Sequence, residues 1–200
     1  MFVSAQALVF AVLPCDTSGQ IQPVDDVQHS PQASNANAVE SSAPVGGQAS
    51  LMASDAHVRG VTSRLVMIIH EATAQSDTFR GLVDQISQTN GVVYVAAGEC
   101  GHGVQACLVP AMTTMGPNRV LRILVDGRRA DRDLMGSIGH ELQHAIEVLS
   151  RRSIRTCSAM ILLYKELCDA CGPRFETDEA VRAGNAVRDE LRKSAQARPK

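Results

Sequence analysis

The sequence has no tryptophan and few other aromatic residues, which limits the kinds of surface that it can offer. Aromatic residues make up 3% of the 200 residues, and the formal net charge at pH 7 is only −2. Binding of nucleic acids relies on clustered positive charge, and binding of single strands also on aromatic stacking. We therefore expect no nucleic-acid partner, and a core built from valine, isoleucine, leucine, methionine and alanine.

The sequence also lacks an apolar run of the length that a transmembrane helix needs, about 20 residues. Its first 14 residues, MFVSAQALVFAVLP, carry no charged side chain. We expect residues 1–14 to be the apolar region of a signal peptide, the alternative being a disordered or mis-started N-terminus. The expected localisation is therefore exported (periplasmic, envelope-associated or secreted), with a cytoplasmic location as the alternative. We expect no integral membrane span.

The six cysteines are too few to form a disulfide scaffold in a chain of this length. Cys100 and Cys107 flank a glycine-rich turn. They predict a short-range disulfide in an exported protein, or free thiols in a cytosolic one. Cys168 and Cys171 form a single C-x-x-C motif at the end of an expected helix, where ordinary thiols or a disulfide are more typical than a zinc or redox site.

Composition divides the chain into a linker and one folded domain. Residues 15–54 are rich in serine, glutamine, alanine, asparagine, proline and glycine, and they have few large apolar side chains. Such a segment cannot bury enough surface to offset the entropy lost on ordering, so we expect a disordered linker. The folded domain is expected over residues 55–200, a normal size for a single core.

The apolar spacing predicts an α+β fold. Two helices are expected first, one capped by Ser54 or Asp55 and carrying Val58 to Ala72, the other capped by Ser76 or Asp77. Three β-rich stretches then predict a small antiparallel or mixed sheet, and helical spacing returns afterwards. The expected strands cover residues 92–95, 104–109 and 119–126, and the later helices cover residues 131–150, 157–167 and 177–194.

One motif predicts specific chemistry, the H-E-x-x-H pentapeptide that runs from His140 to His144. On a helix its two histidines lie one turn apart on the same face, where both imidazoles can bind one Zn²⁺. Glu141 can then accept a proton from a water molecule that the metal holds. The motif therefore predicts a zinc site with His140 and His144 as ligands and Glu141 as the catalytic residue.

The surroundings of the histidines on this helix leave one alternative open, an exposed pair with no metal. The histidines lie roughly opposite a narrow apolar stripe, which is made of Leu134, Ile138, Leu142, Ala145 and Leu149. Glu147 and Arg151 share the side of the histidines, so the pair could instead decorate a solvated surface. The motif spacing and the uncharged residues around it favour the metal site.

A catalytic zinc usually has three protein ligands, and the last helix offers the third. Its buried stripe is expected to contain Ala180, and Glu176 falls on that stripe if the helix extends back by one turn. A carboxylate in a buried stripe is costly unless it is paired or bound to metal. We expect Glu176 to be the third ligand, with Glu179 in reserve. The alternative places Glu176 outside the helix, beside Thr177 as its cap.

These residues give the chain a resemblance to gluzincin-type (HExxH...E) zinc metallopeptidases. His140 and His144 match the histidine ligands of that family, Glu141 matches its catalytic glutamate, and Glu176 matches its downstream glutamate. The stretches IGHELQHAIEVL and FETDEAVRAGNAV are also similar to uncharacterised bacterial envelope proteins with a minimal zincin core. The resemblance covers roughly residues 92–192 and implies a zincin-like fold, with the sheet packed on the active-site helix.

The resemblance has one departure. Many gluzincins have an aspartate four residues after the glutamate, where it orients a zinc-binding histidine, and this chain has Ala180 there. The residue that would orient the imidazoles is therefore not identified by the sequence.

The expected function is hydrolysis of peptide bonds in a peptide or protein substrate, with Zn²⁺ as cofactor and Glu141 as general base. Tyr164 is a candidate donor to the oxyanion. The first alternative is a non-catalytic zincin-like module, in which the metal is structural and the surface binds an envelope partner. The second is a metal-free helical interaction domain.

Overall fold

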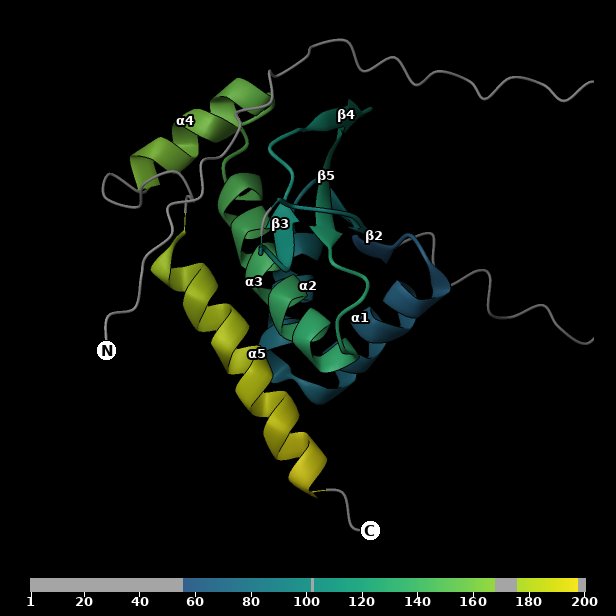
Figure 1. Cartoon of the computed structure of the whole chain (residues 1–200). Coiled ribbons are helices and arrows are strands. Elements are labelled where there is room, and N and C mark those ends of the chain that lie inside the picture. The colour runs from purple at the N-terminus through teal and green to yellow at the C-terminus, as the bar shows by residue number, and fades with distance from the viewer. Residues whose placement is uncertain (1–55, 102, 168–175, 198–200) are drawn as a thin grey trace, which may run out of the picture. The chain divides into compact units, whose positions relative to one another are not determined.

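The computed structural model describes residues 56–101, 103–167 and 176–197. The expected signal peptide, the linker and the C-x-x-C motif lie outside the described residues. The described part combines helices with a small sheet in an α+β arrangement, as the sequence predicts (Figure 1). Their order is β1 (Val58–Gly60), α1 (Ser63–Gln75), α2 (Asp77–Ser87), β2 (Gly91–Ala97), β3 (Ala106–Leu108), β4 (Thr113–Met115), β5 (Asn118–Val125), α3 (Asp131–Leu149), α4 (Cys157–Leu167) and α5 (Asp178–Ala197).

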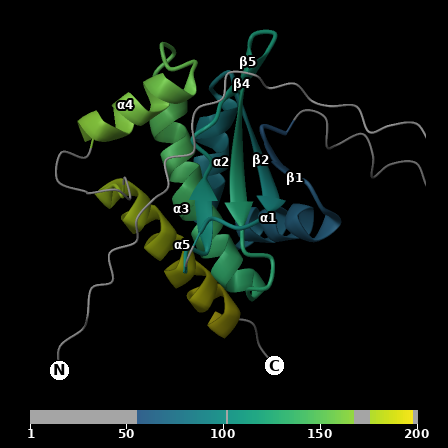
Figure 2. The ribbon, with the colours of Figure 1, turned by 45° about the horizontal axis from the view of Figure 1, so that its top comes forward.

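The sheet is mixed. Strands β1, β2 and β5 run parallel and lie side by side (Figure 2), whereas β3 and β4 pair antiparallel with the outer edge of β5. Residues 110–112 stand opposite the single residue Leu121, because Val109 donates to the Arg122 carbonyl and Thr113 is paired with Val120. Strands β3 and β4 are thus one edge segment that is interrupted by a bulge at Pro110, which cannot donate to the ladder.

One face of the sheet carries the core. Alternate residues of β5 are buried, and they line up in register with buried valines of β2 and β1, for example Leu121 with Val93 and Val58. Helices α1, α2 and α3 pack against the strands, and α5 runs alongside α3 (Figures 1 and 2). Every member of the apolar stripe predicted for α3 is buried, so this helix is fixed between the sheet and α5.

The helix starts are partly as predicted. Ser76 caps α2 through its hydroxyl, which accepts from Phe79 N–H at 3.0 Å. The prediction for the first helix was wrong at its start: Val58 belongs to strand β1, and α1 begins after the cap Thr62. Helix α3 has Ala130 at its cap position, which offers no side-chain hydrogen bond. Asp131 and Asp133 lie in the first turn of α3, where negative charge is favourable.

The edge segment of the sheet is tied down by a disulfide. Cys100 and Cys107 are bonded to each other, which confirms one of the two outcomes left open by the sequence. Cys107 lies in β3, so the bond fixes this short strand to the loop before it. Among the residues that the structure describes, no helix is both long and apolar enough to cross a membrane.

Glu190 of α5 fastens the N-terminus of α2. Its carboxylate accepts hydrogen bonds from the Ser76 hydroxyl at 2.6 Å, from Thr78 N–H at 3.0 Å and from the Thr78 hydroxyl at 2.6 Å. Burial acts to raise the pKa of Glu190, but these hydrogen bonds outweigh it and lower the pKa below its ordinary value. The fold therefore favours the charged form of this carboxyl.

Glu190→Gln is expected to lower the free energy of unfolding by about 1 kcal/mol at pH 7, because a neutral amide accepts weaker hydrogen bonds. A carboxyl whose pKa is lowered on folding stabilises the protein above its unfolded pKa, and this stabilisation is lost as the pH falls through the folded value. Urea unfolding should therefore show the gap between variant and wild type closing between pH 7 and about pH 3. Asp84→Asn, exposed on α2, is the control. A gap that is the same at both pH values would contradict this expectation.

Candidate metal centre

Helix α3 places the two motif histidines together, as the sequence predicts. The ring centroids of His140 and His144 lie 5.0 Å apart, with the ring planes at 77° to each other. The side chains are only 18% and 9% exposed, so the solvated-surface alternative does not hold for this pair. Burial of two imidazoles on one face is typical of a site in which both serve a common partner.

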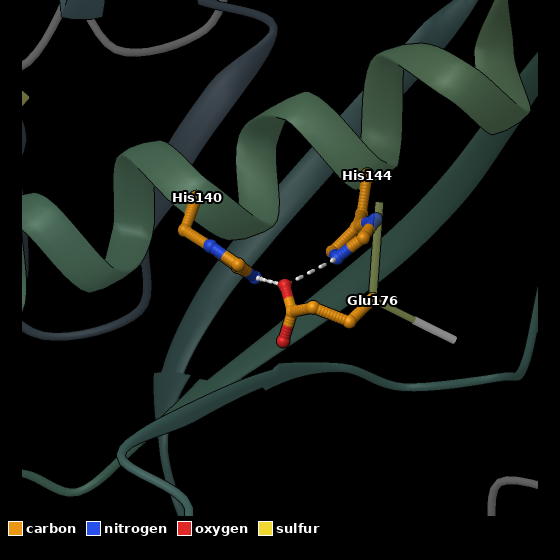
Figure 3. Close-up of side chains that lie close together, drawn as sticks. All are labelled: His140, His144 and Glu176. Carbon is orange, nitrogen blue, oxygen red and sulfur yellow. Dashed lines mark ion pairs between the residues drawn. The ribbon is translucent and has the colours of Figure 1, made fainter. Parts of the chain in front are cut away.

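Glu176 provides that partner. Its Oε1 lies 2.8 Å from His140 Nε2 and 3.9 Å from His144 Nε2, and Figure 3 shows both rings directed at this one oxygen. Glu176 nevertheless lies outside helix α5, since it precedes the cap Thr177. The expectation that it sits on the buried helical stripe was therefore wrong, although the residue reaches the histidines. Glu179 points elsewhere and pairs with Arg182 at 2.5 Å.

The three side chains offer donor atoms of a kind that could hold a metal ion. One donor atom from each of His140, His144 and Glu176 lies within 4.8 Å of the other two. Two ligands bound to Zn²⁺ at about 2.0–2.1 Å with tetrahedral angles lie about 3.4 Å apart. The 2.8 and 3.9 Å between Glu176 Oε1 and the two imidazole nitrogens lie on either side of this value, so both distances are compatible with a shared metal ion.

The charge around His140 bears on metal affinity. Burial acts to lower the pKa of His140, but the hydrogen bond to Glu176 and the charges of Glu141 and Glu176 outweigh it, so the pKa lies above its ordinary value. A proton and a metal ion compete for the same nitrogen. Zinc binding at this site should therefore weaken as the pH falls.

Glu141 lies beside the three groups and is almost fully buried. Its Oε2 accepts a hydrogen bond from the Leu108 N–H of strand β3 at 2.7 Å, and its Oε1 lies 3.9 Å from His140 Nε2. Burial raises the pKa of the Glu141 carboxyl above its ordinary value, and the neighbouring His144, His140 and Leu108 N–H oppose this rise only in part. A raised pKa is what a carboxyl needs in order to take up and release a proton near neutral pH.

The ring of His144 is held from two further sides. Its Nδ1 lies 2.9 Å from Glu147 Oε2, and the ring of Tyr164 meets it edge-on at a centroid distance of 5.7 Å. The buried Tyr164 hydroxyl donates to the backbone carbonyl of His144 at 3.1 Å. In the structure Tyr164 supports helix α3, and its role as a donor to an oxyanion stays a prediction.

Small residues bring α5 close to the histidines. Ala180, Ala183 and Gly184 are buried on α5, and a side-chain carbon on Gly184 would lie only 3.0 Å from the Cβ of His140 on α3. Glycine at this position therefore allows α5 to lie close to α3 beside His140.

Sequence reasoning missed three residues of this centre: Glu147, Thr177 as a partner of Glu147, and Leu108 through its backbone. Glu147 lies three residues after His144, a spacing at which side chains on a helix meet, so its contact had a signal in the sequence. The Leu108 contact depends on where β3 lies in the sheet, and nothing in the local sequence indicates it.

No protein-family model matches the chain, and comparisons with curated proteins and with solved structures give no match either. The function must therefore be inferred from the site itself.

Proposed function

We propose that this chain is a zinc-dependent metallopeptidase of the gluzincin type with a zincin-like core. His140, His144 and Glu176 bind the metal, and Glu141 is the general base. The observation that carries this proposal is the convergence of two imidazoles and one carboxylate on a common point, with a second, buried carboxylate beside it. Three protein ligands leave a fourth position for the reaction, which is the pattern of catalytic rather than structural zinc.

Bound Zn²⁺ would polarise the scissile carbonyl and lower the pKa of a coordinated water to about 7. The role of the chain is then to move a proton. Glu141 takes the proton from the attacking water at Oε1, the oxygen on the side of His140, and delivers it to the leaving amine. Leu108 N–H holds the other oxygen, so the carboxylate keeps one orientation throughout.

The position of strand β3 supports a peptide as substrate. Strand β3 is an edge strand of the sheet, and the Leu108 N–H points away from β5 toward Glu141. The outer side of this strand therefore lies next to the centre, and an extended peptide can add to such an edge through main-chain hydrogen bonds. The Cys100–Cys107 disulfide, which is typical of exported proteins, supports an exported location.

A second function has one observation in its favour. The hydrogen bond from Leu108 N–H occupies one oxygen of Glu141, and the carboxyl is buried, as in a group that only joins a helix to a strand. On this alternative the module is non-catalytic, its metal is structural, and its surface binds an envelope partner. Such a module would hydrolyse no peptide with or without metal, and removal of the metal by a chelator would lower its melting temperature strongly.

The metal itself is tested with His144→Ala. Wild-type protein is expected to hold about one zinc per chain by elemental analysis. The variant is expected to bind zinc more than about 100-fold more weakly, because removal of a ligand costs more than the ~10–100-fold typical of an outer-shell partner. His70→Ala, an exposed histidine on α1, is the control. Wild-type protein without zinc after loading and dialysis would disprove the proposal and favour a metal-free domain.

A further inference from the structure

We infer that Glu147 is the positioning residue of the metal centre: it fixes the ring of His144 and, through Thr177, the segment that carries Glu176. This inference rests on the proposed function, because it concerns the same site. Many gluzincins use an aspartate to orient a zinc-binding histidine, and this chain has Ala180 at that position. Glu147 would take over this orienting role. Both oxygens of Glu147 are bonded to His144 and Thr177, so it acts through the two ligands.

The first contact decides which nitrogen of His144 can bind metal. Glu147 Oε2 lies 2.9 Å from His144 Nδ1, and the two side chains are 11% and 9% exposed. A carboxylate accepts hydrogen bonds, so this contact favours the tautomer of His144 with its proton on Nδ1. Nε2 is then left with a free electron pair, and it is this nitrogen that faces Glu176. Glu147 thus selects the tautomer that a metal ligand requires.

The second contact reaches the third ligand. The Thr177 hydroxyl donates to Glu147 Oε1 at 2.7 Å and accepts from Ala180 N–H at 3.2 Å, as the cap of α5. Thr177 is buried and directly follows Glu176 in the chain. Each oxygen of Glu147 therefore holds one side of the centre: one bonds the ligand His144 on α3, and the other bonds Thr177, the neighbour of the ligand Glu176.

Helix stability does not explain a carboxylate at this position. Glu147 lies two residues before the end of α3, where the helix dipole disfavours negative charge. Its side chain is also largely buried, which costs free energy unless both oxygens are bonded. The hydrogen bonds to His144 and Thr177 meet this need, and both lead to the metal centre.

Two variants with a matched control test this role. Glu147→Ala is expected to weaken zinc binding by about 10–100-fold in competition with a chromophoric chelator. Glu147→Gln keeps the shape and an acceptor oxygen, so it should recover most of that loss. Glu166→Ala, which removes an exposed carboxylate on α4 that pairs with Arg151, should bind zinc like the wild type.

A metal-free measurement separates positioning from general damage to the fold. The ¹⁵N shifts of the His144 ring report its tautomer, and we expect Nδ1–H in the wild type and in Glu147→Gln. In Glu147→Ala the ring should shift toward Nε2–H, because no carboxylate holds the proton on Nδ1. Unchanged zinc affinity and an unchanged tautomer in Glu147→Ala would overturn the inference. Wild-type protein that binds no zinc would instead overturn the metal centre as a whole, and the tautomer result would still show whether Glu147 fixes the ring.

Discussion

Glu141→Gln is expected to lower peptide hydrolysis strongly and to leave zinc binding intact. Glutamine keeps the shape of the side chain and an oxygen that can accept from Leu108 N–H, so the fold and the three ligands are retained. It cannot take a proton from water, however, and loss of a general base typically lowers the rate by about 10²–10⁴-fold. The measurements are kcat/KM with a broad peptide library or casein, and zinc content by elemental analysis of the same samples.

The outcome distinguishes the enzyme from the structural module. Glu166→Gln, at an exposed position on α4, serves as the control for loss of a carboxylate. Equal hydrolysis by wild type and Glu141→Gln would end the proposal that Glu141 is the base. If both bind zinc, neither hydrolyses any peptide, and chelation lowers the melting temperature of both, the metal is structural and the alternative function is correct.

The fold was predictable wherever apolar residues repeat over several turns or several strand residues. The stripe of α3 and the alternation in β5 are of this kind, because each face meets a uniform environment along its whole length. Strand β1 was not predictable in this way. It has only three residues, and Val58 is buried because it pairs with Val93 of β2, a contact distant in sequence. Its apolar residues fit the helical spacing equally well.

In the candidate site, too, a local pattern predicted some residues, and others depend on contacts distant in sequence. The histidines were found because the motif is local and a helix converts its spacing into geometry. Glu176 was chosen because it was assumed to continue the stripe of α5, whereas the helix starts two residues later and the carboxylate reaches His140 from a non-helical segment. Glu147 was placed on the polar side of α3. Its burial depends on Thr177, the cap before α5, which no periodicity in α3 can reveal.

A second large effect is expected at Arg119, the largest fully buried polar side chain in the described residues. The guanidinium lies at the C-terminus of α3, where the last carbonyl groups of a helix have no partner within the helix. Nη1 and Nη2 donate at 2.6–3.4 Å to four backbone carbonyls, those of Val148, Leu149, Arg151 and Ile154. Nε donates to Asn90 Oδ1. One side chain thus caps the helix that carries the histidines.

Arg119→Met should lower the free energy of unfolding by about 3–5 kcal/mol, because the carbonyls remain buried after their donor is gone. Burial lowers the pKa of Arg119, helped by Arg155 and Arg152, yet the negative end of the helix dipole favours the charged form. Arg119→Lys keeps the charge but not the planar fork of donors, so an intermediate loss is expected. The measurement is the midpoint of urea unfolding, with Arg122→Met, exposed on the same strand, as the control. If Arg119→Met unfolds at the wild-type midpoint, the carbonyls find other donors and the buried guanidinium is not what holds the end of α3.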